Sequence, residues 1–570
     1  MGVEMVDCGE GVRLERGVGC RLSDGTVLRS DHYYPAPESA AGDKFPTLLM
    51  RQPYGRDIAS TVVYAHPVWF ARRGYNVVIQ DVRGRGGSEG TFYPFRHEGR
   101  DGAETIAWLR ARPESNGRVG MYGFSYQGAT QLLAAAEQPE GLQCIAPAMT
   151  ACDLYAGWFY HHGALRLASS QGWGVQMLKE DAVRLGLREA RARLESAWTN
   201  LRAQTWAMPY AEHPAYADAN LPSYVRDWFE HDTPGEYWQA MDVSTRAEKI
   251  TVPALHVSGW YDTYLEGSVR GFELLRMQAG TQHARENQYL LAGPWVHIPW
   301  GDRVGESDLG TAALMNTDEL LLRWFDHWLK DAGTFAREPK VRHFAMGVNC
   351  WCEADEWTGS ELVRLFLSSG GRAESRKGDG VLVDESAGPP DVFVYDPEVP
   401  VLSPGGAQGV SGPTDQAALE MGNNLLVYTG EVLHEAMHVF GAPKVALYAS
   451  TSASHADVTA KLVRVLPSGR AEVVCIGIAR STYLFGDTYK ADTVQRWEFA
   501  LEPTSTVFAA GERVRLEVAG GAFPLYDRNP SNATPPRQMS PWSWGRSTHM
   551  VFHDAERPSV LELPVWRENA

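Results

Sequence analysis

The sequence predicts an α/β domain that is interrupted by a helical insertion and followed by an all-β domain. Three observations predict this class. Short apolar runs alternate with helix-like stretches in the first part of the chain, few β-branched runs occur from about 151 to 248, and short alternating runs follow from about 355. Strands that alternate with helices indicate a parallel sheet with crossover helices. We therefore expect a split α/β domain (1–150 and 249–354), a helical cap (151–248) and a jelly-roll β-sandwich domain (355–570).

The strands of the α/β part are predicted from apolar runs that turn residues bound. In chain order these runs are FPTLLM at 45–50, YNVVIQD at 75–81, RVGMYGF at 118–124, LQCIAPA at 142–148, VPALHVSG at 252–259 and QYLLAGPW at 288–295. Residues 97–114 and 314–330 carry apolar residues at helical spacing, so we expect helices there. The pattern resumes after the insertion, which indicates one domain built from two chain segments.

The other two parts of the chain have different patterns. The insertion is rich in Ala, Leu and Arg, and it holds six of the 19 tryptophans of the chain. Such tryptophans are either buried structural side chains or rings that a cap presents to a substrate. The last part contains short alternating runs at regular spacing, which are typical of a β-sandwich. They include VRLFLSS, KVALYAST, AKLVRVLP, EVVCIGIAR and RVRLEVAG.

Charge and composition indicate the class of partner. The net charge of −17 over 570 residues argues against nucleic acid or an anionic membrane surface as partner. No stretch approaches the roughly 20 apolar residues of a membrane span, and no basic segment followed by an apolar run opens the sequence. The seven scattered cysteines fit reduced thiols. We therefore expect a cytoplasmic protein that acts on a small molecule.

The stretch MYGFSYQGAT at 121–130 places a serine between two glycines, directly after a predicted strand. A nucleophilic serine on a sharp strand-to-helix turn carries the pattern G-x-S-x-G. Gly123 and Ser125 fit this pattern, but Gln127 occupies the place of the second glycine and Gly128 comes one residue late. Taken alone, the stretch is compatible with a nucleophile or with a small residue at a strand–helix junction.

Two further residues stand where a serine nucleophile needs partners. A serine hydroxyl needs a general base, and the base needs a carboxylate that orients it. Asp262 follows the strand at 252–259, and His297 follows the strand at 288–295. Because the carboxyl ends of parallel strands lie at one edge of the sheet, these residues and Ser125 are predicted to form a catalytic triad. Taken singly, Asp262 could cap a helix and His297 could be a buried structural histidine.

An acyl-transfer site also needs hydrogen-bond donors for the oxyanion. One expected donor is the backbone N–H of Tyr126, the residue after the nucleophile. The other is expected from the loop RQPYGR after the first strand, where the phenol of Tyr54 is the conspicuous donor. The alternative for Tyr54 is simple packing beside Pro53.

Six separated motifs together resemble one known family. They are, in chain order, RQPYGR, QDVRGRGGSEGTF, GFSYQG, SGWYD, GPWVH and GPTDQ. The set resembles the cocaine esterase family of α/β-hydrolases, which also includes X-prolyl dipeptidyl aminopeptidases and α-amino-acid ester hydrolases. The nucleophile motif of this family, G-x-S-Y-x-G, accounts for the late Gly128. The resemblance covers nearly the whole chain and implies an α/β-hydrolase domain with a helical cap and a C-terminal jelly roll. It implies no cofactor and no metal, and it is compatible with a homodimer.

The resemblance also implies a role for each candidate residue. Ser125 would be the nucleophile, His297 the base and Asp262 the group that orients the base. The Tyr54 hydroxyl and the Tyr126 amide would form the oxyanion hole. The implied reaction is hydrolysis of an ester or amide through an acyl-enzyme.

The substrate pocket follows from the same resemblance, which implies Trp158, Trp173 and Tyr264 near the acyl group. Relatives that accept free α-amino acyl groups resemble one another in carrying acidic residues just after the triad aspartate, where this chain has Tyr264 and Leu265. An ammonium group there would lose its hydration without an ionic partner. This favours an aromatic or otherwise apolar acyl group. Glu266 keeps open the alternative of an X-prolyl dipeptidyl-peptidase or an α-amino-acid ester hydrolase or acylase.

Three competing interpretations carry less weight. HEAMH at 434–438 matches the zinc-protease pattern H-E-x-x-H, but its context is strands and turns rather than a helix. GRGGSEG at 84–90 lacks the spacing of a phosphate-binding loop and is interpreted as a tight turn. A binding scaffold with an inactive hydrolase domain is a further alternative, which the complete set of Ser, Asp, His and Tyr side chains speaks against.

Overall fold

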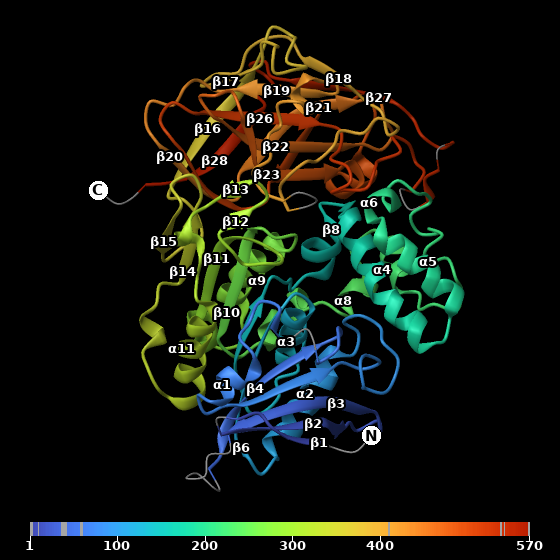
Figure 1. Cartoon of the computed structure of the whole chain (residues 1–570). Helices are drawn as coiled ribbons and strands as arrows, with labels where there is room; N and C mark the ends of the chain where they lie inside the picture. Colours follow the sequence, from blue (N-terminus) through green and yellow to red (C-terminus); the bar gives the residue numbers. More distant parts are fainter. Residues whose placement is uncertain are drawn as a thin grey trace.

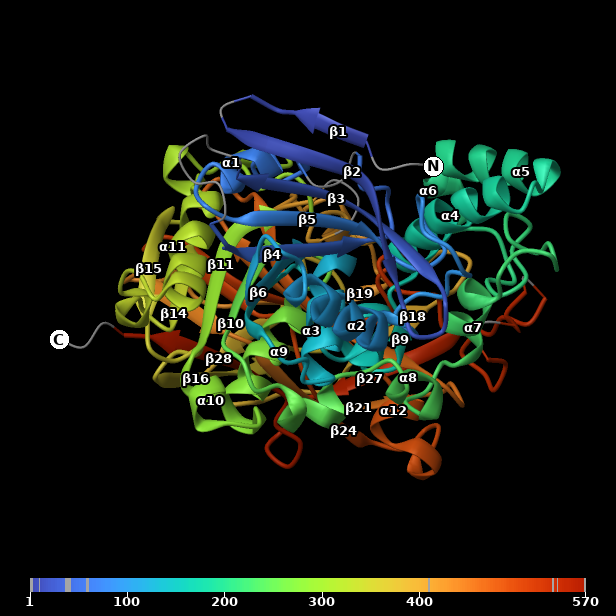
Figure 2. The same cartoon turned by 90° about the horizontal axis from the view of Figure 1, so that it is seen from below.

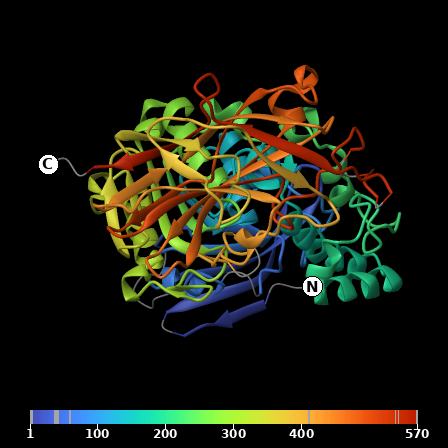
Figure 3. The ribbon, with the colours of Figure 1, turned by 90° about the horizontal axis from the view of Figure 1, so that it is seen from above.

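The computed structural model describes residues 4–9, 11–35, 43–57, 61–407, 411–535, 538–540 and 542–567. Figure 1 shows the α/β domain below, the β domain above it and the helical insertion at one side. Seen from above, the β domain covers the α/β sheet while the insertion extends beyond it (Figure 3). The predicted fold class is confirmed, whereas the residue boundaries of the domains stay a prediction.

Among the described residues, eleven strands form the sheet of the α/β domain. Its order is β1-β2-β3-β5-β4-β6-β7-β10-β11-β14-β15, and Figure 2 shows the first strands of this order side by side. The strands are β1 (Glu4–Asp7), β2 (Val12–Arg21), β3 (Val27–Pro35), β4 (Phe45–Gln52), β5 (Asn76–Asp81), β6 (Ser115–Phe124), β7 (Leu142–Ala148), β10 (Ala254–Tyr261), β11 (Gln288–Val296), β14 (Val341–Ala345) and β15 (Cys350–Ala354). The neighbours from β5 to β14 pair in parallel, and these strands include all six that the sequence predicts.

Helices cover both faces of this sheet because its central strands are apolar on both sides. Leu48 and Met50 of β4 pack with Trp324 on one face, whereas Leu49 packs with Ile106 on the other. The helices of this domain are α1 (Pro67–Ala71), α2 (Glu98–Arg110), α3 (Tyr126–Ala136), α9 (Leu265–Gln278), α10 (Gln282–Glu286) and α11 (Thr317–Lys330). Both predicted helices are therefore present, as α2 and α11.

The insertion is helical, as expected, and it shares one hydrophobic core with α2 and α3. Its elements are η2 (Tyr155–Phe159, a π-helix), β8 (Tyr160–His161), β9 (Ala164–Leu165), α4 (Leu167–Arg184), α5 (Arg188–Thr199), α6 (Leu201–Gln204), α7 (Tyr224–Glu230), α8 (Glu236–Gln239) and η3 (Ser244–Lys249). The sequence pattern missed the short hairpin of β8 and β9. Trp158, Trp228 and Trp238 are buried, whereas Trp198 and Trp206 are exposed.

The β domain is a single hydrogen-bonded sheet that folds around one apolar core. Its strands are β16 (Glu361–Ser368), β17 (Val381–Val383), β18 (Asp391–Tyr395), β19 (Leu425–Thr429), β20 (Met437–Gly441), β21 (Lys444–Thr451), β22 (Asp457–Val465), β23 (Ala471–Arg480), β24 (Gln495–Ala500), β25 (Thr504–Phe508), β26 (Arg513–Ala519), β27 (Ser547–Phe552) and β28 (Val560–Trp566). Short helical turns connect them: η6 (Leu419–Met421), α12 (Ser481–Leu484) and η7 (Gly486–Thr488). β18 and β24 alternate between buried and exposed side chains, whereas β23 and β25 are buried along their whole length. None of the described helices has both the length and the apolar character that crossing a bilayer requires.

Two of the competing motifs have structural explanations. The HEAMH segment forms no helix, because β20 begins at Met437 and Nε2 of His438 lies 2.8 Å from Oγ of Ser505. GRGGSEG forms a turn after β5, in which the Gly84 N–H donates to the Glu89 carbonyl (2.8 Å). The structure therefore favours a strand and its preceding loop at 434–438 and a tight turn at 84–90, as the sequence context indicates.

Candidate active site

Ser125 lies at the sharp turn between β6 and α3. Its backbone has φ 61° and ψ −129°, in the positive-φ region that L-residues rarely adopt. Such a conformation costs about 1–3 kcal/mol and persists only where its surroundings enforce it. The Ser125 N–H donates to the Ala148 carbonyl of β7 (2.8 Å), which fixes the turn against the neighbouring strand. The side chain is thereby held at the carboxyl edge of the parallel sheet.

The unusual Gln127 supports this turn from within. Its side-chain oxygen accepts a hydrogen bond from the Phe124 N–H (3.2 Å), and Nε2 of Gln131 donates to the Gly123 carbonyl (3.0 Å). Gly128 then permits close packing, because a Cβ at this position would lie 2.7 Å from Cβ of Thr150. Close packing of α3 against Thr150 therefore explains why a glycine stands at position 128.

Asp262 and His297 form a hydrogen-bonded pair at the same edge. Oδ1 of Asp262 lies 2.7 Å from Nδ1 of His297, the aspartate is buried, and the imidazole is about one-third exposed. Within the described residues, Oδ2 of Asp262 has no hydrogen-bond partner. A buried carboxylate on Nδ1 fixes the ring orientation and leaves Nε2 for proton exchange.

Ring contacts place His297 beside the turn of Ser125. The His297 ring centroid lies 5.5 Å from the ring of Phe124, the residue before Ser125, and 5.3 Å from the ring of Tyr264. The structure thus brings together the three residues that the sequence predicts as a triad. Their catalytic roles belong to the proposal below.

Tyr54 lies in the loop after β4, with its hydroxyl near Ser125. Burial raises the pKa of the Tyr54 phenol, and hydrogen bonding with Trp173 and Ser125 opposes this shift. The net rise keeps the phenol neutral at pH 7, so it retains a proton to donate. The position of this hydroxyl fits a donor to an oxyanion on a carbon bound by Ser125.

Tyr126 is the first residue of α3, so its backbone N–H has no acceptor within the helix. Its hydroxyl is anchored elsewhere: it donates to Oε1 of Glu98 (2.7 Å) and accepts from the Phe95 N–H (2.9 Å). Arg51 supports Glu98 at 2.8 Å. A buried network that the sequence analysis did not find thus fixes the start of α3.

Aromatic rings from the cap and α/β domain surround the site. Trp158 stacks on Tyr264 with centroids 4.1 Å apart, and it lies 5.7 Å from Trp173. Phe95, which the sequence analysis missed, contacts Trp158, Trp173 and Tyr126 at 5.1, 5.7 and 4.8 Å. Its φ of 67° is rare for a bulky residue, and no local sequence signal marks it.

Glu266, the remaining carboxylate after the candidate triad aspartate, is committed to arginines. Its Oε2 lies 3.1 Å from Arg166 and its Oε1 lies 3.6 Å from Arg270. The fully buried Arg166 also contacts Oε1 of Glu502 in the β domain at 3.1 Å. Cap, α/β domain and β domain therefore meet in one ion network directly behind the site.

One group of residues in the described chain could offer donors to a metal ion. Ligand atoms of His161, His162 and Glu266 all lie within 4.8 Å of one another. The two arginines on Glu266 oppose a cation at this place, because like charges repel strongly where water is scarce. Burial, followed by the neighbouring His162 and the two arginines, lowers the pKa of His161 well below its usual range, so its ring is neutral.

Comparison with known proteins finds family matches over both domains. Residues 24–299 match the X-Pro dipeptidyl-peptidase family (S15), and residues 333–562 match the X-Pro dipeptidyl-peptidase C-terminal non-catalytic domain. The chain is 31% identical over 575 residues to the cocaine esterase of Rhodococcus sp. (strain MB1 Bresler), which covers 95% of this chain and 97% of that protein.

Solved structures share the fold over the full length. An α-amino-acid ester hydrolase superposes with a TM-score of 0.78 at 23% identity and covers 99% of this chain and 98% of its own. An aminopeptidase from the marine sediment archaeon Thaumarchaeota archaeon gives 0.77 at 24% identity, with 96% and 95% covered. Together with the sequence matches, these findings show that the chain is a serine hydrolase of esters or amides and belongs to the α/β-hydrolase family of cocaine esterase and the S15 X-Pro dipeptidyl-peptidases.

Proposed function

We propose that the protein hydrolyses esters or amides of a small apolar acyl group that carries no free amine, with Ser125 as nucleophile. The observation that carries the proposal is the Asp262–His297 hydrogen bond of 2.7 Å beside the strained turn of Ser125. This arrangement matches the nucleophile, base and orienting carboxylate that acyl transfer needs. We expect a small-molecule substrate, because Trp158 of the cap packs on Tyr264 beside His297 and so covers part of this edge of the sheet.

In the proposed mechanism, His297 takes the proton of the Ser125 hydroxyl as its oxygen attacks the carbonyl carbon. Asp262 holds Nδ1 of the ring, so Nε2 receives this proton and the carboxylate stabilises the imidazolium. His297 then gives the proton to the departing alcohol or amine. Water, activated by the same ring, finally hydrolyses the acyl-enzyme and frees Ser125.

Two donors would stabilise the tetrahedral intermediate in this mechanism. The Tyr54 hydroxyl and the Tyr126 N–H would donate to the oxyanion. Support comes from the raised pKa of Tyr54, whose burial outweighs the hydrogen bonds that lower it, and from the place of Tyr126 as the first residue of α3. A side-chain phenol is an unusual donor here, since most α/β-hydrolases use two backbone N–H groups.

The choice of an amine-free acyl group rests on Glu266. An ammonium in this pocket needs a carboxylate, and the Glu266 carboxylate already pairs with Arg166 and Arg270. Displacing these arginines would leave Arg166 buried without one of its two partners. The aromatic contacts of Trp158 and Tyr264 instead favour a flat or aliphatic acyl group. We therefore prefer an esterase or amidase over the X-prolyl dipeptidyl-peptidase and α-amino-acid ester hydrolase alternatives.

We also propose a cytoplasmic location. All seven cysteines are free, and four of them are buried. Free thiols of this kind are typical of reducing compartments, since oxidising ones favour disulfides.

The test is a matched set of substrates. Initial rates would be measured on a benzoyl ester, a short aliphatic ester, a phenylalanine ester with a free amine and a Gly-Pro anilide. Ser125→Ala serves as the blank, and its thermal unfolding checks that the fold is intact. We expect the two amine-free esters to have the higher kcat/KM.

The outcomes test the substrate class and the mechanism separately. Preference for either amine-bearing substrate would contradict the assignment of Glu266 and would favour the peptidase or amino-ester alternative. Undiminished turnover by Ser125→Ala would contradict the mechanism itself. Equal loss of activity on all four substrates in Ser125→Ala would support one nucleophile for the whole set.

A further inference from the structure

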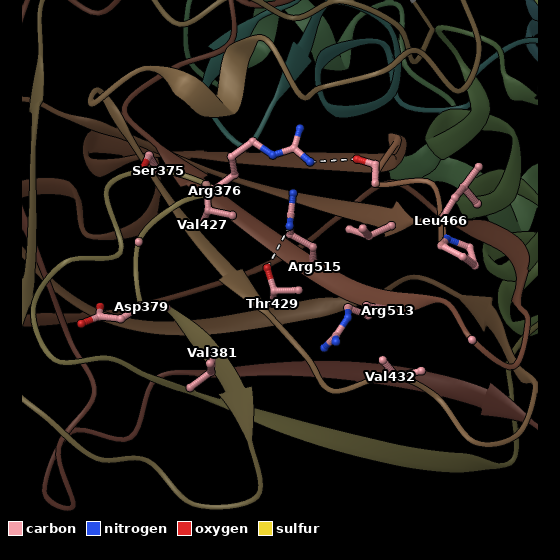
Figure 4. Close-up of a pocket in the computed structure, with 16 residues that line it drawn as sticks. Ser375, Arg376, Asp379, Val381, Val427, Thr429, Val432, Leu466, Arg513 and Arg515 are labelled. Carbon is pink, nitrogen blue, oxygen red and sulfur yellow. Dashed lines mark hydrogen bonds between the residues drawn. The ribbon is translucent and has the colours of Figure 1, made fainter.

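A cavity of about 660 Å³ opens on the β domain (Figure 4). Its walls come from the loop at 375–380, from β17, β19 and β26, and from the turn at 465–469. Its lining includes none of the candidate active-site residues. The proposed hydrolysis therefore leaves this cavity unexplained.

Strand alternation places charged side chains at the floor of the cavity. In β26, Val514, Leu516 and Val518 face the core, so Arg513, Arg515 and Glu517 face the opposite side of the sheet. The register of the sheet agrees with this orientation of Arg515. Arg515 lies opposite Thr429 of β19, and its Nε donates to the Thr429 hydroxyl (2.9 Å). Figure 4 shows Arg376, Arg513 and Arg515 in the lining of this cavity, with the guanidinium group of Arg513 directed away from those of Arg376 and Arg515.

Arg376 and Arg515 belong to a network of cations and carboxylates. Oε2 of Glu420 is shared between Arg515 (2.5 Å) and Arg376 (3.5 Å), and Glu517 pairs with Lys461 (2.9 Å). Burial raises the pKa of Glu517, and the neighbouring Glu420 adds to this shift while Lys461 opposes it. Asp415 also interacts electrostatically with Arg376, so these three cations have three carboxylates near them within the described residues.

Arg513 adds a fourth cation to the same surface. Its Nη1 donates a hydrogen bond to the Gly430 carbonyl (2.9 Å), and within the described residues it has no carboxylate partner. The one carboxylate in the cavity wall, Asp379, pairs with the exposed Arg372 at 3.3 Å. The cavity thus carries excess positive charge at a place that solvent and small molecules reach.

Apolar side chains form one part of the remaining wall, beside the polar Ser375 and Thr429. Val381 and Val432 are each 39% exposed, and Leu466 and Pro467 lie beside them. A volume of this size is in the usual range for organic ligands, which combine apolar contact with a few fixed polar groups. It exceeds what a single inorganic anion fills.

We propose that this cavity binds a small organic anion, with its oxyanion group on Arg513 and its apolar part against Val381 and Val432. Guanidinium groups match the planar, two-oxygen geometry of carboxylates and phosphates. A carboxylate or phosphate ester would neutralise the charge of Arg513. An uncharged molecule of the same shape would not.

The experiment is isothermal titration calorimetry of the full chain with benzoate, phenyl phosphate and the uncharged benzamide. We expect at least one anion to bind at least tenfold more tightly than benzamide, and Arg513→Gln to weaken this binding at least tenfold. Tighter binding of benzoate assigns the site to carboxylic acids, which include the acids released by ester hydrolysis. Tighter binding of phenyl phosphate assigns it to phosphate monoesters.

Controls separate this site from the candidate active site and from misfolding. Arg364→Gln removes an exposed arginine of the same domain, paired with Glu562, and should leave anion binding unchanged. Val432→Glu adds a negative charge at an exposed rim position and should weaken binding without the loss of any arginine. Absence of anion binding by the wild-type chain, or binding that persists unchanged in Arg513→Gln and Val432→Glu, would overturn the proposal.

Discussion

At the scale of single residues, the proposed mechanism depends on the hydrogen bond between Asp262 and His297. The bond uses Oδ1, while Oδ2 is buried without a partner in the described part of the chain. A buried carboxylate with few donors keeps its charge focused on the imidazole. We therefore expect the orientation and tautomer of the His297 ring to depend on the charge of Asp262.

Asp262→Asn tests this dependence with nearly the same side-chain volume. The amide can donate to Nδ1 and so favours the wrong tautomer of His297, and we expect kcat to fall by about 10³–10⁴-fold with little change in KM. Steady-state kinetics on a benzoyl ester measures this, with circular dichroism as a check of the fold. A loss below tenfold would mean that Asp262 does not orient the base.

Tyr54→Phe tests the phenolic donor. Removing one oxyanion donor is expected to lower kcat by about 10²–10³-fold while KM changes little. Tyr34→Phe is the matched control, since Tyr34 lies on β3 opposite Arg13 of β2. Equal kinetics of both variants would assign Tyr54 a packing role only.

The sequence predicts the position of candidate residues that directly follow a strand. It does not predict residues whose importance comes from contacts with distant parts of the chain. Ser125, Asp262 and His297 could be found because parallel strands end at one edge. Phe95 and Glu98 could not, because their importance lies in contacts with Tyr126 across the fold. No local pattern encodes such a contact.

At the scale of elements, the junction of β6 and α3 shows why a variant motif retains the usual turn. Gln127 and Gln131 satisfy backbone groups of β6 that the turn leaves open, and Gly128 lets α3 approach the strand end at Thr150. The delayed glycine is therefore a packing requirement of α3. The strained φ of Ser125 is maintained by this helix as much as by the turn itself.

Gly128→Ala tests this packing. Its Cβ would lie 2.7 Å from Cβ of Thr150 and 2.9 Å from the Ala148 carbonyl, so we expect a loss of about 1–3 kcal/mol in unfolding free energy and reduced kcat. Gly235→Ala is the control, since its Cβ would meet nothing within 4 Å and its φ is extended. Denaturant titration of both variants measures the difference. Equal stability would mean that α3 moves freely away from Thr150.

At the scale of the whole molecule, Arg166 joins three chain segments that are far apart in sequence. It comes from the cap, and its partners are Glu266 of α9 and Glu502 of the β domain. The backbone adds a second tie, because the Leu167 N–H donates to the Leu525 carbonyl (3.0 Å). Cap, catalytic sheet and β domain are thus fixed together at one buried point.

Arg166→Met tests this junction through its dependence on pH. Burial raises the pKa of Glu502, and Arg166 opposes this rise. A raised pKa in the folded state means that stability is lost as pH rises above the ordinary value of the carboxyl. Without Arg166 the pKa of Glu502 rises further, so we expect a loss of about 3–5 kcal/mol near neutral pH and a smaller loss near pH 5.

Thermal unfolding of Arg166→Met at pH 5 and pH 8 measures this difference. Arg496→Met is the control, since Arg496 forms an exposed pair with Glu498, and such pairs contribute about 1 kcal/mol or less. A loss that is the same at both pH values would show that the charge of Glu502 does not matter for the junction.

The spacing of hydrophobic residues predicts how the chain divides into an α/β part and a β part. It does not predict which residues join these parts. Alternation of strands and helices separated the α/β part from the β-sandwich. The pairing of Arg166 with Glu502 spans 336 residues, and no spacing rule connects such positions. For the same reason the sequence left Glu266 open as a partner for a substrate amine, since no local pattern indicates its pairing with Arg166 and Arg270.

The Arg166 junction also limits how such enzymes can be recombined. A chimera that combines this catalytic half with the β domain of a relative must bring a carboxylate to the position of Glu502, or it buries the Arg166 guanidinium with only one of its two carboxylate partners. We therefore expect a stable chimera only where the two parent proteins carry matching residues at this junction, even if each domain folds well by itself.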